Sequence, residues 1–279
     1  MVMVKKLLTL SLLLTTFATC ATAQKLTVIR SSHLHCDDSV LVFIPSQNAD
    51  NYKESSLPAL YLLHGWSGCY RNWADKSDIQ KAADQSGFII ICPDGFYNSW
   101  YANDSNPEGM QYREFFHREL YPAMKIDYNL DPARTFITGL SMGGNGAMNL
   151  FFDDPSKFAA AGSMSGALNL HNSKSLAEKW MSKVLGPYEP DNKRYDEESS
   201  VNRVALAKGC GKLLLVSCGY DDSLFKGSVE FVKNCKKEGV PYVALFSPGN
   251  HSWYFWDYSL QLHLWYFKRI LNGENLGYK

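Results

Sequence analysis

One short segment constrains the fold of this chain more than any other. It is an apolar, β-type run at 135–138 that leads directly into Gly139-Leu140-Ser141-Met142-Gly143 and then into a predicted helix at 145–150. A serine between such a strand and helix lies on a sharp, strained turn with its hydroxyl exposed, and the flanking glycines avoid Cβ clashes there. Because G-x-S-x-G alone is a common chance pattern, the surrounding strand and helix carry the prediction that Ser141 is a nucleophile.

A serine hydroxyl is a weak nucleophile near neutral pH, so it requires a base and a third group that orients the base. Only His171, His251 and His263 follow Ser141 in the sequence. We expect His263, inside an aromatic helical pattern, to be a packed or surface histidine rather than the base, and His171, in a polar stretch, to lie on the surface. His251 follows a strand-like run and the turn at 247–250, so it is the predicted base.

The acid is expected on the loop after the preceding strand, because acid and histidine follow the serine in that order in α/β hydrolases. The apolar run at 212–219 ends in Tyr220-Asp221-Asp222. One aspartate faces the histidine, and the other caps the next helix or is solvated. We predict Asp222 as the acid and keep Asp221 as the alternative.

The negative charge that develops on an attacked carbonyl oxygen needs backbone N–H donors. Met142, directly after the serine, supplies one of them. The second is expected from the glycine-rich turn that follows the apolar run at 57–63, with Trp66 as the donor. His64, at the end of that run, is interpreted as a structural hydrogen-bonding residue.

Six blocks of sequence resemble those of one known family, in the same order along the chain. The blocks are LLHGWSG at 62–68 with Trp73, PDGFYNSWY at 93–101, GLSMGG at 139–144, SMSG at 163–166, CGYDDSL at 218–224 and PGNHSW at 248–253. Together they resemble the Putative esterase family of α/β hydrolases. Its relatives include S-formylglutathione hydrolases, feruloyl and acetyl-xylan esterases, and mycolyltransferases.

The resemblance covers essentially the whole chain after residue 23 and implies a serine esterase without a cofactor. It implies Ser141 as nucleophile, Asp222 as acid and His251 as base, with Trp66 and Met142 as oxyanion donors. The chain departs from the family at Asn145, a position that often holds histidine.

The expected architecture is one α/β-hydrolase catalytic domain at 24–279, with a mostly parallel central sheet and helices on both faces. Near-continuous apolar runs at 88–92 and 159–163 are typical of strands that are buried on both sides. The longer, more polar segment at 168–211 is predicted to form a short cap over the site.

Residues 1–23 have the pattern of a secretory signal peptide: a basic Lys5-Lys6, an apolar core at 7–17 and small residues before Gln24. The apolar core is too short to span a membrane. We therefore expect a secreted or periplasmic protein. A lipoprotein anchor on Cys20 is the competing interpretation, and Thr19 is a poor residue to precede such a cysteine.

Export implies an oxidising compartment, in which cysteines can pair. We predict a disulfide between Cys210, just before the run at 212–218, and Cys235, late in the helix predicted at 224–238. That helix must return antiparallel to the strand, which brings its end near the strand's start.

The formal net charge is zero, with Lys+Arg 28 and Asp+Glu 28, so nothing suggests a nucleic-acid partner. No Cys/His spacing resembles a metal site. Aromatic residues cluster near the predicted mouth, and Trp100, Tyr101 and Trp253 are the predicted substrate-binding residues.

The predicted activity is hydrolysis of a small acyl, acetyl or feruloyl ester on a plant-type carbohydrate, through an acyl-enzyme. The identity of the substrate rests on the family resemblance alone. Two alternatives remain open. An acyltransferase would use the same site, and a relative without catalysis would only bind carbohydrate.

Overall fold

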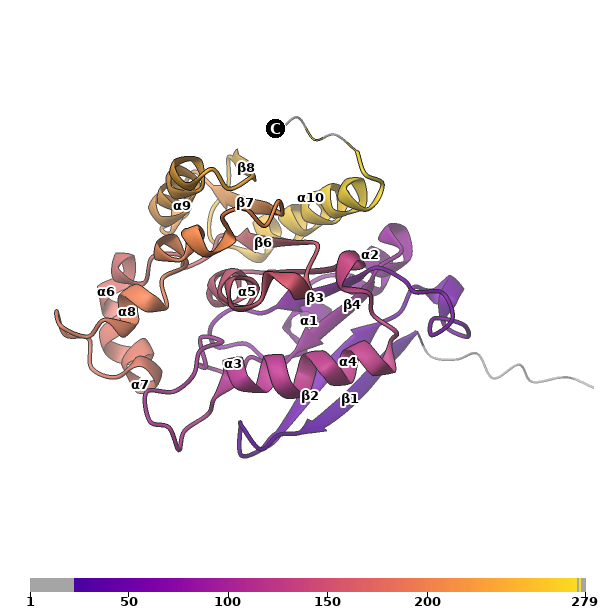
Figure 1. Ribbon diagram of the computed structural model, residues 1–279, viewed down its shortest axis with the longest axis horizontal. Coiled ribbons are helices and arrows are strands. Elements are labelled where there is room, and N and C mark those ends of the chain that lie inside the picture. Colours follow the sequence, from indigo (N-terminus) through magenta and orange to yellow (C-terminus); the bar gives the residue numbers. More distant parts are fainter. Residues whose placement is uncertain (1–22, 275, 277–279) are drawn as a thin grey trace, which may run out of the picture.

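The described part of the chain builds one sheet of eight strands, in the order β1-β2-β4-β3-β5-β6-β7-β8 (Figure 1). This computed structural model describes residues 23–274 and 276. β1 and β2 are antiparallel to their neighbours, and the strands from β4 to β8 run in parallel. The strands are β1 Gln24–Arg30, β2 Asp37–Phe43, β3 Ala59–Leu63, β4 Ile89–Pro93, β5 Thr135–Gly139, β6 Ala160–Met164, β7 Leu213–Gly219 and β8 Tyr242–Ser247. The predicted mostly parallel α/β sheet is confirmed.

Helices cover both faces of the sheet, as expected (Figure 1). The helices are α1 Asn72–Lys76, α2 Ile79–Ser86, α3 Tyr112–Phe115, α4 Tyr121–Asp127, α5 Met142–Asp153, α6 Lys174–Leu176, α7 Ser182–Leu185, α8 Arg194–Glu197, α9 Phe225–Glu238 and α10 Trp253–Leu271. A π-helical turn, Phe116–Leu120, joins α3 to α4.

Two apolar cores result, one on each side of the sheet, because side chains alternate along a strand. In β3, Tyr61 and Leu63 belong to the core beneath α3, α4, α5 and α9, whereas Leu60 and Leu62 belong to the core beneath α1, α2 and α10. Strands β3 to β7 are buried at every position. This burial explains why their sequences are continuous apolar runs rather than alternating ones.

The segment at 168–211 folds into the short helices α6, α7 and α8 with irregular turns between them, at one end of the molecule (Figure 1). A second π-helical turn, Ala177–Met181, lies between α6 and α7. Leu176 reaches the cavity described below. The segment therefore forms the short cap that the sequence predicts.

The predicted disulfide between Cys210 and Cys235 is wrong, because both cysteines are free thiols in the structure. Cys235 is fully buried against the α9 side of the sheet, on the same helix face as Phe231. Cys210 lies in the loop before β7 and is partly exposed.

The predicted signal peptide, apart from Ala23, falls outside the described residues. Among the helices that the structure does describe, none has the length and apolar character needed to cross a membrane.

Candidate active site

Ser141 forms the sharp turn between β5 and α5. Its backbone lies in a strained region, with φ 52° and ψ −116°. The turn is held by hydrogen bonds, since the Ser141 N–H donates to the Met164 carbonyl at 3.0 Å and the Ser141 carbonyl accepts from Ala167 N–H at 3.1 Å.

The glycines of G-x-S-x-G allow the backbone of the turn and of α5 to lie close to the neighbouring strands. A Cβ on Gly143 would lie 2.4 Å from the His64 carbonyl oxygen, and a Cβ on Gly139 would lie 2.5 Å from the Gly143 carbonyl oxygen. Helix α5 can therefore start directly against β3 and β5, which fixes the position of Ser141 at the C-terminal edge of the sheet.

The structure brings together the three residues that the sequence singles out. His251 Nε2 lies 3.0 Å from Ser141 Oγ, and His251 Nδ1 lies 2.9 Å from Asp222 Oδ2. Ser141 follows β5, Asp222 follows β7 and His251 follows β8. Asp221, the alternative acid, is exposed, and no hydrogen bond joins its side chain to His251 within the described residues.

Asp222 is buried, and its surroundings favour the ionised carboxylate. Burial by itself raises the pKa of Asp222, but the hydrogen bond and charge of His251 and the Leu224 N–H outweigh it and lower the pKa. The Leu224 N–H donates to Asp222 Oδ1 at 2.8 Å. With the carboxylate accepting from Nδ1–H, the Nε2 of His251 is left free to accept the serine proton. Trp256 packs edge-on against the imidazole, at 4.8 Å between ring centroids.

Two backbone amides next to the serine have the properties of oxyanion donors. Met142 is the first residue of α5, and the N–H groups in the first turn of a helix have no partner within the helix. Trp66 lines the same cavity as Ser141. Neither N–H donates to another described residue.

A cavity of about 720 Å³ opens in front of Ser141 and His251. Its walls combine aromatic and aliphatic side chains with polar ones. Among the residues around it are Trp66, Trp100, Leu176, Leu224, Trp253 and Trp256, with Asn72 and Lys76.

Trp100 and Trp253 thus lie where substrate contacts are expected, but the prediction for Tyr101 is wrong. Tyr101 is fully buried beneath the site, and its hydroxyl donates to the His64 carbonyl at 3.0 Å. Its ring fills the space over Gly95 and Gly146, where an added Cβ would lie within 2.5 Å of it.

The other histidines have structural surroundings. His64 is buried, and its Nε2 accepts the Gly95 N–H at 2.7 Å, which ties β3 to the loop after β4. His263 is buried between Thr138 Oγ1 at 2.9 Å and Ser217 Oγ at 3.1 Å, and burial lowers its pKa to about 3. His171 is exposed beside Asp196.

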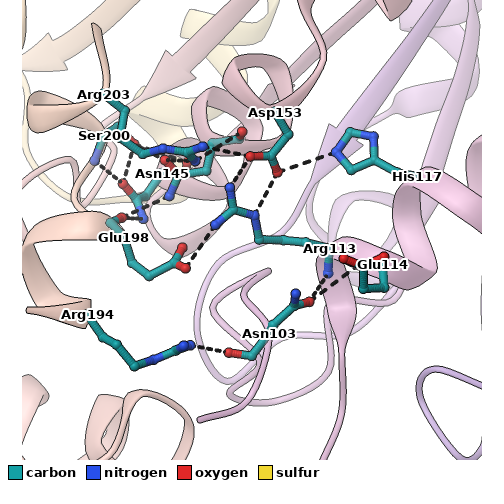
Figure 2. A network of polar contacts seen from close by, with 11 residues as sticks. Asn103, Arg113, Glu114, His117, Asn145, Asp153, Arg194, Glu198, Ser200 and Arg203 are labelled. Carbon is teal, nitrogen blue, oxygen red and sulfur yellow. Dashed lines mark hydrogen bonds and ion pairs between the residues drawn. The ribbon is translucent and has the colours of Figure 1, made fainter. Parts of the chain in front are cut away.

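A polar network connects the end of α5 to the α3 segment and the cap, and no sequence pattern predicts it (Figure 2). Arg113 binds Asp153 through Nε at 2.6 Å and Glu198 through its Nη1 at 2.9 Å, and Arg203 binds Asp153 at 2.7 Å. Burial alone raises the pKa of Asp153, but hydrogen bonds from His117 and Arg113 and the arginine charges hold it well below its usual range. The network joins the α3 segment, the end of α5 and the cap.

Asn145 belongs to the same network and lies one turn after Ser141 (Figure 2). Its Nδ2 donates to the Glu198 carbonyl at 2.9 Å, and its Oδ1 accepts from the Ser200 N–H at 3.1 Å. Its departure from the family pattern was the one sequence signal at this position. The structure shows that Asn145 connects the serine helix to the cap.

The strand order and the serine between β5 and α5, facing a histidine after the last strand, define an α/β hydrolase of the serine-hydrolase type. The chain belongs to the Putative esterase family, whose model matches residues 31–266. This confirms the resemblance inferred from the sequence blocks.

Individual relatives agree with this assignment. The chain is 28% identical to S-formylglutathione hydrolase of Mus musculus, over 90% of this chain and 95% of that protein. It is 26% identical to an acetyl esterase of Caldicellulosiruptor saccharolyticus, over 81% and 91% of the two chains. A solved ferulic acid esterase superposes with a TM-score of 0.76 and 27% identity, covering 88% of this chain and 98% of that one. The protein is a carboxylic ester hydrolase.

Proposed function

We propose that the protein is an exported serine esterase in which Ser141, His251 and Asp222 form the catalytic triad. The observation that carries the proposal is the contact between His251 Nε2 and Ser141 Oγ at 3.0 Å, with Asp222 on the other ring nitrogen. An imidazole held in this way is the base that a serine nucleophile requires.

The proposed reaction has two steps. His251 removes the proton of Ser141 as Oγ attacks the ester carbonyl, and the Trp66 and Met142 amides stabilise the oxyanion. His251 then donates the proton to the departing alcohol, which leaves an acyl group on Ser141. In the second step His251 activates a water molecule, which releases the acid and restores the serine.

We propose small acyl esters as the substrate class, with acetyl or feruloyl groups on a plant-type carbohydrate as the natural ester. Two considerations support this. Trp66, Trp100 and Trp253 give the cavity flat apolar walls, which suit an aromatic acyl group or the face of a sugar. Two relatives bear the names acetyl esterase and ferulic acid esterase.

Export is proposed from the pattern of residues 1–23. Cleavage after Ala23 would leave β1 intact, because that strand begins at Gln24. N-terminal sequencing of protein recovered from the extracytoplasmic fraction tests this, and a mature chain that retains Lys5 would contradict it.

The function is tested with Ser141→Ala on p-nitrophenyl acetate and methyl ferulate. We expect turnover to fall by at least about 10³-fold while the melting temperature is retained, because loss of the nucleophile leaves only binding and oxyanion stabilisation. A fluorophosphonate probe should label the wild-type protein at Ser141 and leave the variant unlabelled. Retention of more than about a tenth of the turnover would refute the role of Ser141. Product analysis with an added alcohol separates hydrolysis from acyl transfer.

A further inference from the structure

The loop after β4 carries a side chain that contacts two residues of the cavity wall and one residue of the cap. This loop is strained, since Phe96, Trp100 and Tyr101 have φ values of 51°, 55° and 55°. Non-glycine residues rarely adopt such values, and they persist only where the surrounding contacts hold them. Asn98 lies in the middle of this loop.

Asn98 uses both ends of its amide. Its Oδ1 accepts the indole N–H of Trp66 at 3.1 Å and that of Trp100 at 3.0 Å. Its Nδ2 donates to the carbonyl of Trp180, in the cap, at 2.8 Å. One side chain therefore links the turn after β3, one wall of the cavity and the cap.

The turn that contains Trp66 has a second connection to the same loop. The Ser67 N–H donates to the Tyr97 carbonyl at 2.9 Å, and Ser67 itself has a φ of 64°. Trp66 also packs against Tyr97 and Trp180, with ring centroids 5.3 Å and 5.1 Å away. The turn that contains Trp66 is thus held by contacts to the loop and the cap as well as by its own strand.

We propose that Asn98 is a positioning residue for ester hydrolysis, which holds the Trp66 turn so that its amide points at the oxyanion. The inference rests on the proposed function of Ser141 and Trp66. Oxyanion donors act at 2.7–3.1 Å from the developing charge, so a small rotation of the turn weakens transition-state binding. Binding of the uncharged ester depends much less on that amide.

Asparagine suits this position for a chemical reason. An amide oxygen has two lone pairs for two indole donors, and the same group supplies an N–H for the Trp180 carbonyl. Leucine has the same number and branching of side-chain heavy atoms as asparagine, but it can make none of these hydrogen bonds. Asn98→Leu would therefore leave two indole N–H groups and one carbonyl without their partner.

The test is a double-mutant cycle of Asn98→Leu and Trp66→Phe on p-nitrophenyl acetate, with Tyr97→Phe as the matched control. Trp66→Phe removes the indole donor and keeps an aromatic ring in the packing. Tyr97→Phe changes a neighbouring ring whose hydroxyl makes no hydrogen bond to Asn98. The affinity for phenylboronic acid, which forms a tetrahedral adduct on a reactive serine, is measured for each variant.

We expect each of Asn98→Leu and Trp66→Phe to lower kcat about 10-fold, with KM changed less than about twofold. The affinity for phenylboronic acid should fall by a similar factor. The kcat of the double variant should be no lower than that of the less active single variant, because both substitutions remove the same contact. Tyr97→Phe should stay within about twofold of wild type.

A loss of kcat below about fivefold, a loss confined to KM, or losses that multiply in the double variant would each overturn the positioning role. If Asn98→Leu does not fold, the kcat and boronate affinity of Trp66→Phe decide the matter alone. Failure of the proposed function has a different signature, because Ser141→Ala would then keep its activity. A wild-type esterase that depends on Ser141 but is indifferent to Trp66→Phe would refute the positioning role alone.

Discussion

Asp38 is a buried acid that should make the stability of the folded protein fall as the pH rises. The residue is the second of β2, its side chain is fully buried, and neither carboxyl oxygen has a well-formed hydrogen bond within the described residues. Burial, followed by the charge of nearby Asp94, raises its pKa from 3.8 to about 9. The folded protein therefore keeps a proton at neutral pH that the unfolded chain releases.

The size of the effect follows from this difference. Between pH 3.8 and about 9 the folded state binds one proton more than the unfolded state at this site. Each pH unit in that interval then lowers the free energy of unfolding by about 1.4 kcal/mol. From pH 5 to pH 8 the contribution of Asp38 falls by on the order of 4 kcal/mol. Below the unfolded pKa the contribution is constant, because both states are protonated.

Asp38→Asn removes this titration and keeps the shape of the side chain. We expect the variant to gain stability relative to wild type as the pH rises, by on the order of 4 kcal/mol between pH 5 and pH 8. Urea unfolding of both proteins at several pH values measures the difference, in which other titrating groups cancel. Asp37→Asn, which removes a carboxylate at the exposed neighbouring position, is the matched control. A difference between Asp38→Asn and wild type that does not change with pH would refute the reasoning.

Three further variants test the site and its support. Asp222→Asn should lower kcat by about three to four orders of magnitude, whereas Asp221→Asn should change kcat little. Steady-state assays of the two variants measure this. If Asp221→Asn had the larger effect, the role of the acid would pass to Asp221. Asp153→Ala should lower the free energy of unfolding by about 3 kcal/mol, because Arg113 and Arg203 lose their shared partner. Urea unfolding measures the change. A change below about 1 kcal/mol would show that the network adds little stability.

The features that the sequence predicts well are those that short-range patterns determine. Continuous apolar runs identify the buried parallel strands, and the spacing of glycines around Ser141 identifies the turn. The order of Ser141, Asp222 and His251 along the chain then places each one after a strand. Since parallel strands end at the same edge of the sheet, residues far apart in sequence meet there.

The errors concern side-chain direction and contacts between distant segments. Trp100 and Tyr101 are adjacent aromatic residues, and composition does not reveal that the second one turns inward over Gly146. The direction of α9 alone predicts the disulfide, but the periodicity of the helix turns Cys235 toward the core. Phe231 and Cys235 are four residues apart, so they share the buried face of that helix.

The contacts of Asn98 and Arg113 join segments that have no common sequence pattern. Arg113 and Glu198 are 85 residues apart, and Asn98 and Trp180 are 82 residues apart. Such pairs are determined by how the cap folds back onto the domain. A single sequence holds no local signal for that arrangement.

The distribution of the Ser141, Asp222 and His251 side chains along the chain has a consequence for biosynthesis. Ser141 and His251 are 110 residues apart, and His251 is held by the loop between the last strand and the last helix. A nascent or partly folded chain therefore has the serine long before it has the base. With the proposed triad, esterase activity can appear only after β8 and α10 have docked. The onset of turnover in a refolding or translation experiment would then report the docking of these last two elements.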